Sequence, residues 1–122
     1  LSNTFDADFS FKTFGIIFEN LCIRDLTIYT SSLKGSVSYY HDDSGTEIDC
    51  VVHLRDGRYA LIECKLGRTN IEKGVKNLLK INKLIEKNDD VRNPEFLAVL
   101  TGGEAAYTRP DGVKVIPIGC LR

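Results

Sequence analysis

Two short runs of β-forming residues decide the fold of this chain: residues 47–54 read EIDCVVHL and residues 58–65 read RYALIECK. A turn of Arg55, Asp56 and Gly57 separates them, and glycine accepts the positive φ that a tight turn needs. The two runs are therefore predicted to form a β-hairpin. Both faces of this hairpin are apolar, which predicts a sheet covered by helices on both sides, with Val51, Tyr59 and Leu61 on one face and Ile48, Cys50, Ala60 and Ile62 on the other.

The length of the turn decides whether two acidic residues of the hairpin meet. If all three turn residues form the loop, Asp49 lies opposite Glu63, and Glu47 lies opposite Lys65. If the loop has two residues, Asp49 lies opposite Cys64 and on the other face of the sheet from Glu63. The apolar pattern fits both registers, so the sequence leaves this choice open.

The segment before the hairpin predicts a helix and a strand. Residues 8–31 carry apolar side chains at a spacing of mostly three and four, and residues 36–41 alternate as in a strand. The buried stripe of this helix is predicted to hold Phe11, Phe14, Phe18, Leu21, Cys22 and Ile28.

The segment after the hairpin predicts a second helix at residues 70–87, with Thr69 or Asn70 as its N-cap. Residues 96–101 form a continuous apolar run, as in a strand buried on both faces. A closing hairpin is predicted around residues 109–112. We therefore expect one α/β domain spanning residues 1–122, a mixed central sheet flanked by helices.

The composition narrows the classes of function. The net charge is -1, and Glu72 and Glu86 dilute the basic residues between Lys65 and Lys87, so no strong electrostatic signature of nucleic-acid binding is present. The four cysteines contain no CxxC pair, which predicts buried free thiols and no zinc site. No apolar run approaches the ~20 residues that cross a bilayer, so we expect a cytoplasmic protein that makes no membrane contact. ATP binding is not expected, because a GxxxxGK[ST] loop is absent.

The acidic pair of the hairpin carries the chemical argument. Two carboxylates directly opposed across strands repel each other and raise one pKa, and a divalent cation relieves this repulsion. Oxygen ligands select hard ions, so Mg²⁺ or Mn²⁺ is expected. Structural readings compete with this one: Glu19 facing solvent on its helix, and Lys65 in a cross-strand ion pair with Glu47. His53, opposite Tyr59 in the three-residue register, is interpreted as a packed or edge histidine rather than a general base.

The residues Glu19, Asp49 and Glu63-Cys64-Lys65, with the predicted element order, resemble the PD-(D/E)XK nuclease superfamily, whose restriction-endonuclease-like core runs α-β-β-β-α-β. Ile48 stands where that superfamily has its proline. The resemblance implies that Asp49, Glu63 and the Cys64 backbone carbonyl hold a cation. It also implies that Glu19 binds a second ion or orients a water, and that Lys65 positions the hydrolytic water or stabilises charge.

A closer resemblance covers nearly the whole chain, including Thr13-Phe14-Gly15, Glu47-Ile48-Asp49 and residues 57–67, 96–102 and 115–121. The chain is similar to the carboxy-terminal domain of unknown function of predicted bacterial and archaeal AAA+ ATPases. That resemblance implies an ATPase module before Leu1 in the same polypeptide, as the partner of this domain.

Two functions stay open. The first is Mg²⁺-dependent hydrolysis of phosphodiester bonds, in DNA. The second is a non-catalytic module that binds nucleic acid or protein, or that regulates or oligomerises the ATPase. The sequence specifies neither the oligomeric state nor DNA over RNA.

Overall fold

The computed structural model describes the backbone of residues 4–121 and side chains from residue 13 onward. It confirms the predicted order of helix, three strands, helix, strand and hairpin, with a short 3₁₀ helix, η1, added at the end. The elements are α1 (Thr4–Ser32), β1 (Ser36–His41), β2 (Glu47–His53), β3 (Tyr59–Cys64), α2 (Arg68–Glu86), β4 (Leu97–Thr101), β5 (Tyr107–Thr108), β6 (Lys114–Pro117) and η1 (Ile118–Leu121).

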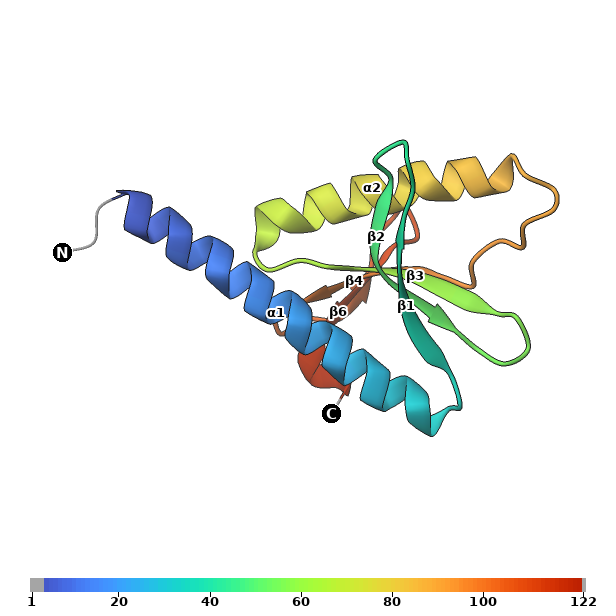
Figure 1. The fold of residues 1–122 in the computed structure, drawn as a ribbon, viewed down its shortest axis with the longest axis horizontal. Helices are drawn as coiled ribbons and strands as arrows, with labels where there is room; N and C mark the ends of the chain where they lie inside the picture. Colours follow the sequence, from blue (N-terminus) through green and yellow to red (C-terminus); the bar gives the residue numbers. More distant parts are fainter. Residues whose placement is uncertain (1–3, 122) are drawn as a thin grey trace.

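The sheet is mixed, with six strands in the order β1-β2-β3-β4-β6-β5. The first three strands pair antiparallel, β3, β4 and β6 pair parallel, and β5 returns antiparallel beside β6. The chain therefore crosses from β3 to β4 through α2, which lies on one face of the sheet (Figure 1). Because parallel strands end at the same edge, the carboxyl ends of β3 and β4 lie side by side, where ligands bind in many α/β folds.

Each face of the sheet has its own apolar core, as the two-sided hairpin predicted. Buried residues of α2 pack against one face, with Val75, Leu78 and Ile81 against Val51, Leu61 and Val99. Buried residues of α1 pack against the other, with Phe18, Cys22 and Leu26 against Cys50, Ile62, Ala98 and Leu100. All five residues of β4 are buried, as expected of a central strand.

The predicted buried stripe of α1 is partly wrong. Phe18 and Cys22 are buried, but Phe14 is 62% exposed and Ile28 is exposed as well. The buried positions Phe18, Cys22, Leu26 and Thr30 recur every four residues and form a narrow stripe, whereas the first half of α1 extends past the sheet (Figure 1). Phe11 lies outside the described side chains. Neither helix, over the described residues, is both long and apolar enough to cross a membrane.

The predicted N-cap of α2 is wrong as well. The helix begins at Arg68, and Gly67 occupies the N-cap position without a side-chain cap. Gly67 has a φ of 88°, which lets the chain turn from strand to helix within three residues. Asn70 instead donates a hydrogen bond to the Leu66 carbonyl.

Candidate functional site: an acidic pair on a bulged hairpin

The structure selects the register that brings the two acidic residues together. Gly57 has a φ of 89°, and the Leu54 N–H donates to the Arg58 carbonyl across the turn at 2.8 Å. Farther from the turn, Cys50 of β2 pairs with Ile62 of β3. The three-residue loop is therefore present, and the next position places Asp49 opposite Glu63.

A β-bulge lies in β2 at Asp49, one member of the acidic pair, and it was not predicted from the sequence. Ser38 of β1 pairs with Val51, but Tyr40 pairs with Ile48, so Asp49 and Cys50 together oppose the single residue Tyr39. Bulges of this kind redirect side chains and are common near active sites. The extra residue also inverts the alternation of β2, which places Ile48 with Val51 in the core under α2 rather than with Cys50 as predicted.

Asp49 joins the ends of the two hairpin strands. Its Oδ2 accepts a hydrogen bond from the Cys64 backbone N–H at 2.9 Å. This hydrogen bond lies just beyond Cys50 and Ile62, the last paired residues of β2 and β3. The carbonyl of an extended residue points the same way as its N–H, so the Cys64 carbonyl points toward Asp49 too.

Glu63 is the most deeply buried acidic residue of the site, at 3% exposure. Asn77 of α2 donates through Nδ2 both to Glu63 Oε1 and to the Glu47 carbonyl. Burial, followed by the hydrogen bond to Asp49 and the negative charge of Asp49, raises the pKa of Glu63 to about 9. At neutral pH Glu63 therefore keeps its proton.

Lys65 contacts both members of the acidic pair. Its Nζ lies 4.0 Å from Asp49 Oδ2 and 4.0 Å from Glu63 Oε2. The rival prediction, an ion pair with Glu47, is not among the ion pairs of the described residues. The ammonium is therefore held between two carboxyl groups.

These groups line a small polar cavity of about 210 Å³ between the hairpin and α2. Its walls are Gly45, Glu47, Asp49, Glu63, Lys65, Lys73 and Asn77. Gly74 allows the close approach of α2, because a Cβ there would lie 3.0 Å from Lys65 Cγ and 3.3 Å from Glu63 Cβ. Sequence reasoning missed Gly74 and Asn77, although a glycine inside an amphipathic helix is a signal of close packing.

Glu19 belongs to the same electrostatic cluster but does not line this cavity. Partial burial and the negative charges of Asp49 and Glu47 raise its pKa, and Lys65 opposes the shift. Among the described residues, no group of three or more His, Cys, Asp or Glu side chains is close enough to hold a metal ion. The structure thus brings together a carboxylate pair with a lysine, and the role of Glu19 stays a prediction.

The remaining candidates lie away from the acidic cavity. Three cysteines are buried free thiols in the core between α1 and the sheet, namely Cys22, Cys50 and Cys64. The sulfurs of Cys50 and Cys64 lie 3.9 Å apart. Hydrogen bonds to Cys22 and Cys50, and burial, raise the pKa of the Cys64 thiol, so it is not a nucleophile. Cys120 is exposed, contrary to prediction.

His53 pairs with Tyr59 across the hairpin, as expected. Its side chain is exposed and lies within hydrogen-bond distance of the Ser38 hydroxyl.

Comparison with known proteins adds a family but no activity. A family model described as a domain of unknown function (DUF4143) matches residues 14–121, a span that includes Glu19, the hairpin and α2. No curated protein and no solved structure matches the chain. On the strength of the family match, which covers most of its length, the chain belongs to the DUF4143 family.

Proposed function

We propose that this chain is a restriction-endonuclease-like domain that hydrolyses phosphodiester bonds in DNA with Mg²⁺ or Mn²⁺. The observation that carries the proposal is the position of Lys65, whose Nζ lies 4.0 Å from one oxygen of Asp49 and 4.0 Å from one oxygen of Glu63. A carboxylate pair with one buried member, Glu63, and one ammonium group at a polar cavity combines cation ligands with a group that can stabilise negative charge.

The arrangement of elements supports the proposed fold. An antiparallel three-stranded unit, β1-β2-β3, is continued by a parallel unit in which β3 leads through α2 to β4. This is the α-β-β-β-α-β order of the PD-(D/E)XK core. We also propose that the domain follows an ATPase module in the same polypeptide. The DUF4143 match is consistent with this arrangement.

The residues present fit a hard divalent cation. Asp49, Glu63 and the Cys64 carbonyl offer oxygen atoms. Burial is the main cause of the raised pKa of Glu63, and the negative charge of Asp49 adds a repulsion that a cation would relieve. Mg²⁺ is commonly held by one or two carboxylates, with water completing its shell, so the pair needs no third carboxylate. A cation bound there would neutralise charge that develops on the phosphate during hydrolysis.

The side chains have separate tasks in this proposal. Asp49 and Glu63 bind the cation, and Asn77 fixes the orientation of Glu63. Lys65 turns from the carboxylates to the phosphate, where its ammonium stabilises negative charge. Glu19 orients a water, which suits a carboxyl whose pKa is raised and whose side chain is partly buried.

Calorimetric titration with Mg²⁺ and Mn²⁺ tests the cation site. Wild type is expected to bind saturably, and the double variant Asp49→Asn, Glu63→Gln is expected not to bind. A control with Asp43→Asn and Asp89→Asn removes two exposed acidic residues elsewhere and should bind as wild type does. Plasmid and oligonucleotide cleavage in Mn²⁺ against EDTA then tests hydrolysis. Wild type that binds no cation and cuts no nucleic acid would sink the proposal.

A specific observation favours a second function, that of a non-catalytic binding module. Phe14, Ile16 and Ile17 are all more than half exposed on the part of α1 that extends past the sheet (Figure 1). Phe14 and Ile17 are three residues apart and so lie on one face of the helix, and exposed apolar side chains on one face are typical of protein interfaces. This alternative predicts binding of a protein or nucleic acid without cleavage in any divalent cation, and retention of binding in the Asp49→Asn, Glu63→Gln variant.

A further inference from the structure

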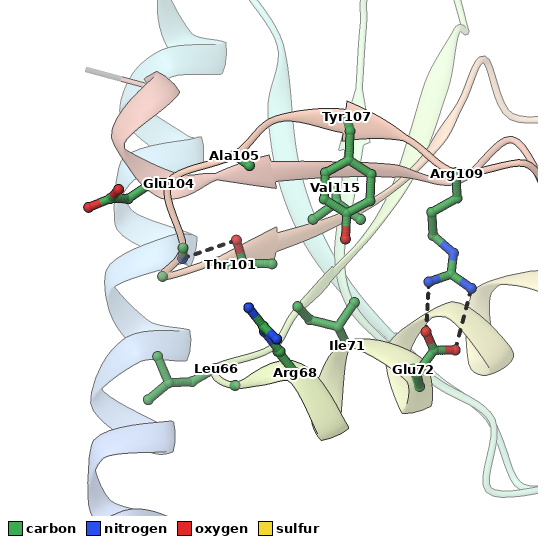
Figure 2. Close-up of a pocket in the computed structure, with 13 residues that line it drawn as sticks. Leu66, Arg68, Ile71, Glu72, Thr101, Glu104, Ala105, Tyr107, Arg109 and Val115 are labelled. Carbon is green, nitrogen blue, oxygen red and sulfur yellow. Dashed lines mark hydrogen bonds and ion pairs between the residues drawn. The ribbon is translucent and has the colours of Figure 1, made fainter.

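A second and larger cavity lies on the opposite side of the first turns of α2. It has a volume of about 620 Å³, within the range of small-molecule sites. Figure 2 shows its walls: the start of α2 on one side, β5 and β6 on the other, and the end of β4 between them. Apolar side chains cover much of the lining, namely Leu66, Ile71, Ala105 and Val115.

Two polar side chains point into this cavity from opposite walls. The ring of Tyr107 comes from β5, and the guanidinium of Arg68 comes from α2 (Figure 2). Tyr107 is half exposed, and neither side chain makes a hydrogen bond or ion pair with the part of the chain that the structure describes. Both are therefore available to a ligand.

The other charged groups of the lining are already compensated or turned away. Arg109 is fixed by Glu72 at 2.7 Å and by Asp111 at 3.2 Å. The carboxylate of Glu104 points out of the cavity in Figure 2. The free groups are therefore one guanidinium, which binds phosphate in a forked geometry, and one aromatic face, on which a base can stack.

We propose that this cavity holds one nucleotide, with its base against Tyr107 and its phosphate at Arg68. The inference rests on the proposed function in one respect: it makes the substrate of the acidic pair a nucleic-acid strand with an unstacked base. In a duplex both faces of each base are covered, so the cavity admits a base from a single strand or from a locally opened duplex.

The two cavities share a wall, which supports a continuous path for the strand. Lys65 lines the acidic cavity, and the next three residues, Leu66 to Arg68, line the larger one. At the edge of the larger cavity, the buried Thr101 hydroxyl accepts a hydrogen bond from the Gly103 N–H at 3.3 Å. At Gly102, a Cβ would lie 3.0 Å from Leu66 Cδ1, so the backbone just after β4 passes close to the residues that precede α2.

Fluorescence anisotropy with a labelled oligo(dT) of twelve nucleotides, in EDTA, tests the inference without hydrolysis. Arg68→Ala and Tyr107→Leu are each expected to weaken binding at least about fivefold, and Tyr107→Phe should bind within about twofold of wild type because it keeps the ring. Arg68→Ala should also reduce the dependence of binding on salt by about one phosphate contact. Arg55→Ala and Tyr29→Leu, at exposed positions outside this cavity, are the matched controls.

Thymidine 5′-monophosphate, titrated separately, distinguishes a free nucleotide from a strand as the ligand. Saturable binding of either probe that Arg68→Ala and Tyr107→Leu weaken supports the proposal and names its source. No binding of either probe, or equal binding by these variants and wild type, overturns it. Failure of the proposed function is separate: wild type would then still bind the strand, and Arg68→Ala and Tyr107→Leu would still weaken that binding, while wild type cuts no strand in Mg²⁺ or Mn²⁺.

Discussion

The two sides of the first turns of α2 face cavities of opposite character. Toward β2 and β3 the helix presents Gly74 and Asn77, and the cavity of about 210 Å³ contains a carboxyl that is 3% exposed and held by a hydrogen bond. Toward β4, β5 and β6 it presents Arg68, and the cavity of about 620 Å³ contains two side chains, Arg68 and Tyr107, that make no hydrogen bond or ion pair within the described chain. In our proposal, the groups that carry out the chemistry are fixed by the core, whereas the two groups that recognise the strand stay free until it binds.

The largest expected effect is on hydrolysis. Lys65→Ala removes the ammonium group from the acidic cavity and should lower the cleavage rate by about 10²–10³-fold. Removal of one donor that stabilises negative charge in the transition state has an effect of this size in other enzymes. Cation affinity should not fall, because the ammonium competes with the cation for Asp49 and Glu63. Cleavage rates and calorimetry on the same samples check both points, with Lys80→Ala as the exposed control. An unchanged cleavage rate would remove Lys65 from the chemistry.

The buried Glu63 predicts an unusual pH dependence of stability in metal-free protein. The pKa of Glu63 is about 9 in the folded chain, and its ordinary value, expected in the unfolded chain, is 4.5. Between pH 4.5 and pH 9 the folded chain therefore keeps a proton that the unfolded chain has released. The stabilising contribution is complete below about pH 4.5, declines as the pH rises through this window, and is lost above about pH 9.

Glu63→Gln mimics the protonated carboxyl and should remove this decline, leaving the variant more stable than wild type by a few kcal/mol at pH 8. Urea denaturation in EDTA between pH 5 and 9 measures the slopes. Parallel curves for the two proteins would show that Glu63 is ionised in the folded state.

The acidic residues of this site could be predicted from the sequence, but the turn that brings them together could not be chosen from it. Gly57 accepts a positive φ, which allows the three-residue loop and thereby places Asp49 opposite Glu63. The sequence left the register open because both faces of the hairpin are apolar, and only tertiary contacts distinguish them. The order of the elements was predictable, since the period of apolar residues changes between helix and strand.

The features that escaped prediction depend on contacts between segments far apart in the chain. The bulge at Asp49 and Cys50 arises from pairing with β1, and alternation within β2 alone cannot reveal it. Asn77 is a polar residue whose two acceptors lie on other elements. The exposure of Phe14 follows from the sheet ending before α1 does, which no periodicity within the helix records (Figure 1).

The close approach of α2 on the acidic side predicts a difference between two glycines. Gly74→Leu would place a side chain where even a Cβ lies 3.0 Å from Lys65 and 3.3 Å from Glu63, and should destabilise the fold by about 1–3 kcal/mol while weakening cation binding. Gly15→Leu on α1 has nothing within 4 Å of its Cβ and should be neutral or stabilising by up to about 1 kcal/mol. Chemical denaturation measures both, and equal effects would mean that α2 does not pack tightly over the pair.

The smallest effect is expected at the ion pair on the other side of α2. Glu72 is mostly exposed, so Glu72→Gln should change stability by less than about 1 kcal/mol and leave cation binding unaltered. It should, however, release Arg109 from one of its two carboxylates and thereby tighten oligo(dT) binding by about two- to threefold, since one negative charge leaves the larger cavity. Glu86→Gln, near the far end of the same helix, removes the same charge outside the cavity and is the control. If both variants bind the strand equally well, the gain comes from the change in net charge and not from the release of Arg109. Strand binding in the larger cavity would then depend on Arg68 and Tyr107 alone, and the contrast with the acidic cavity would rest on these two residues.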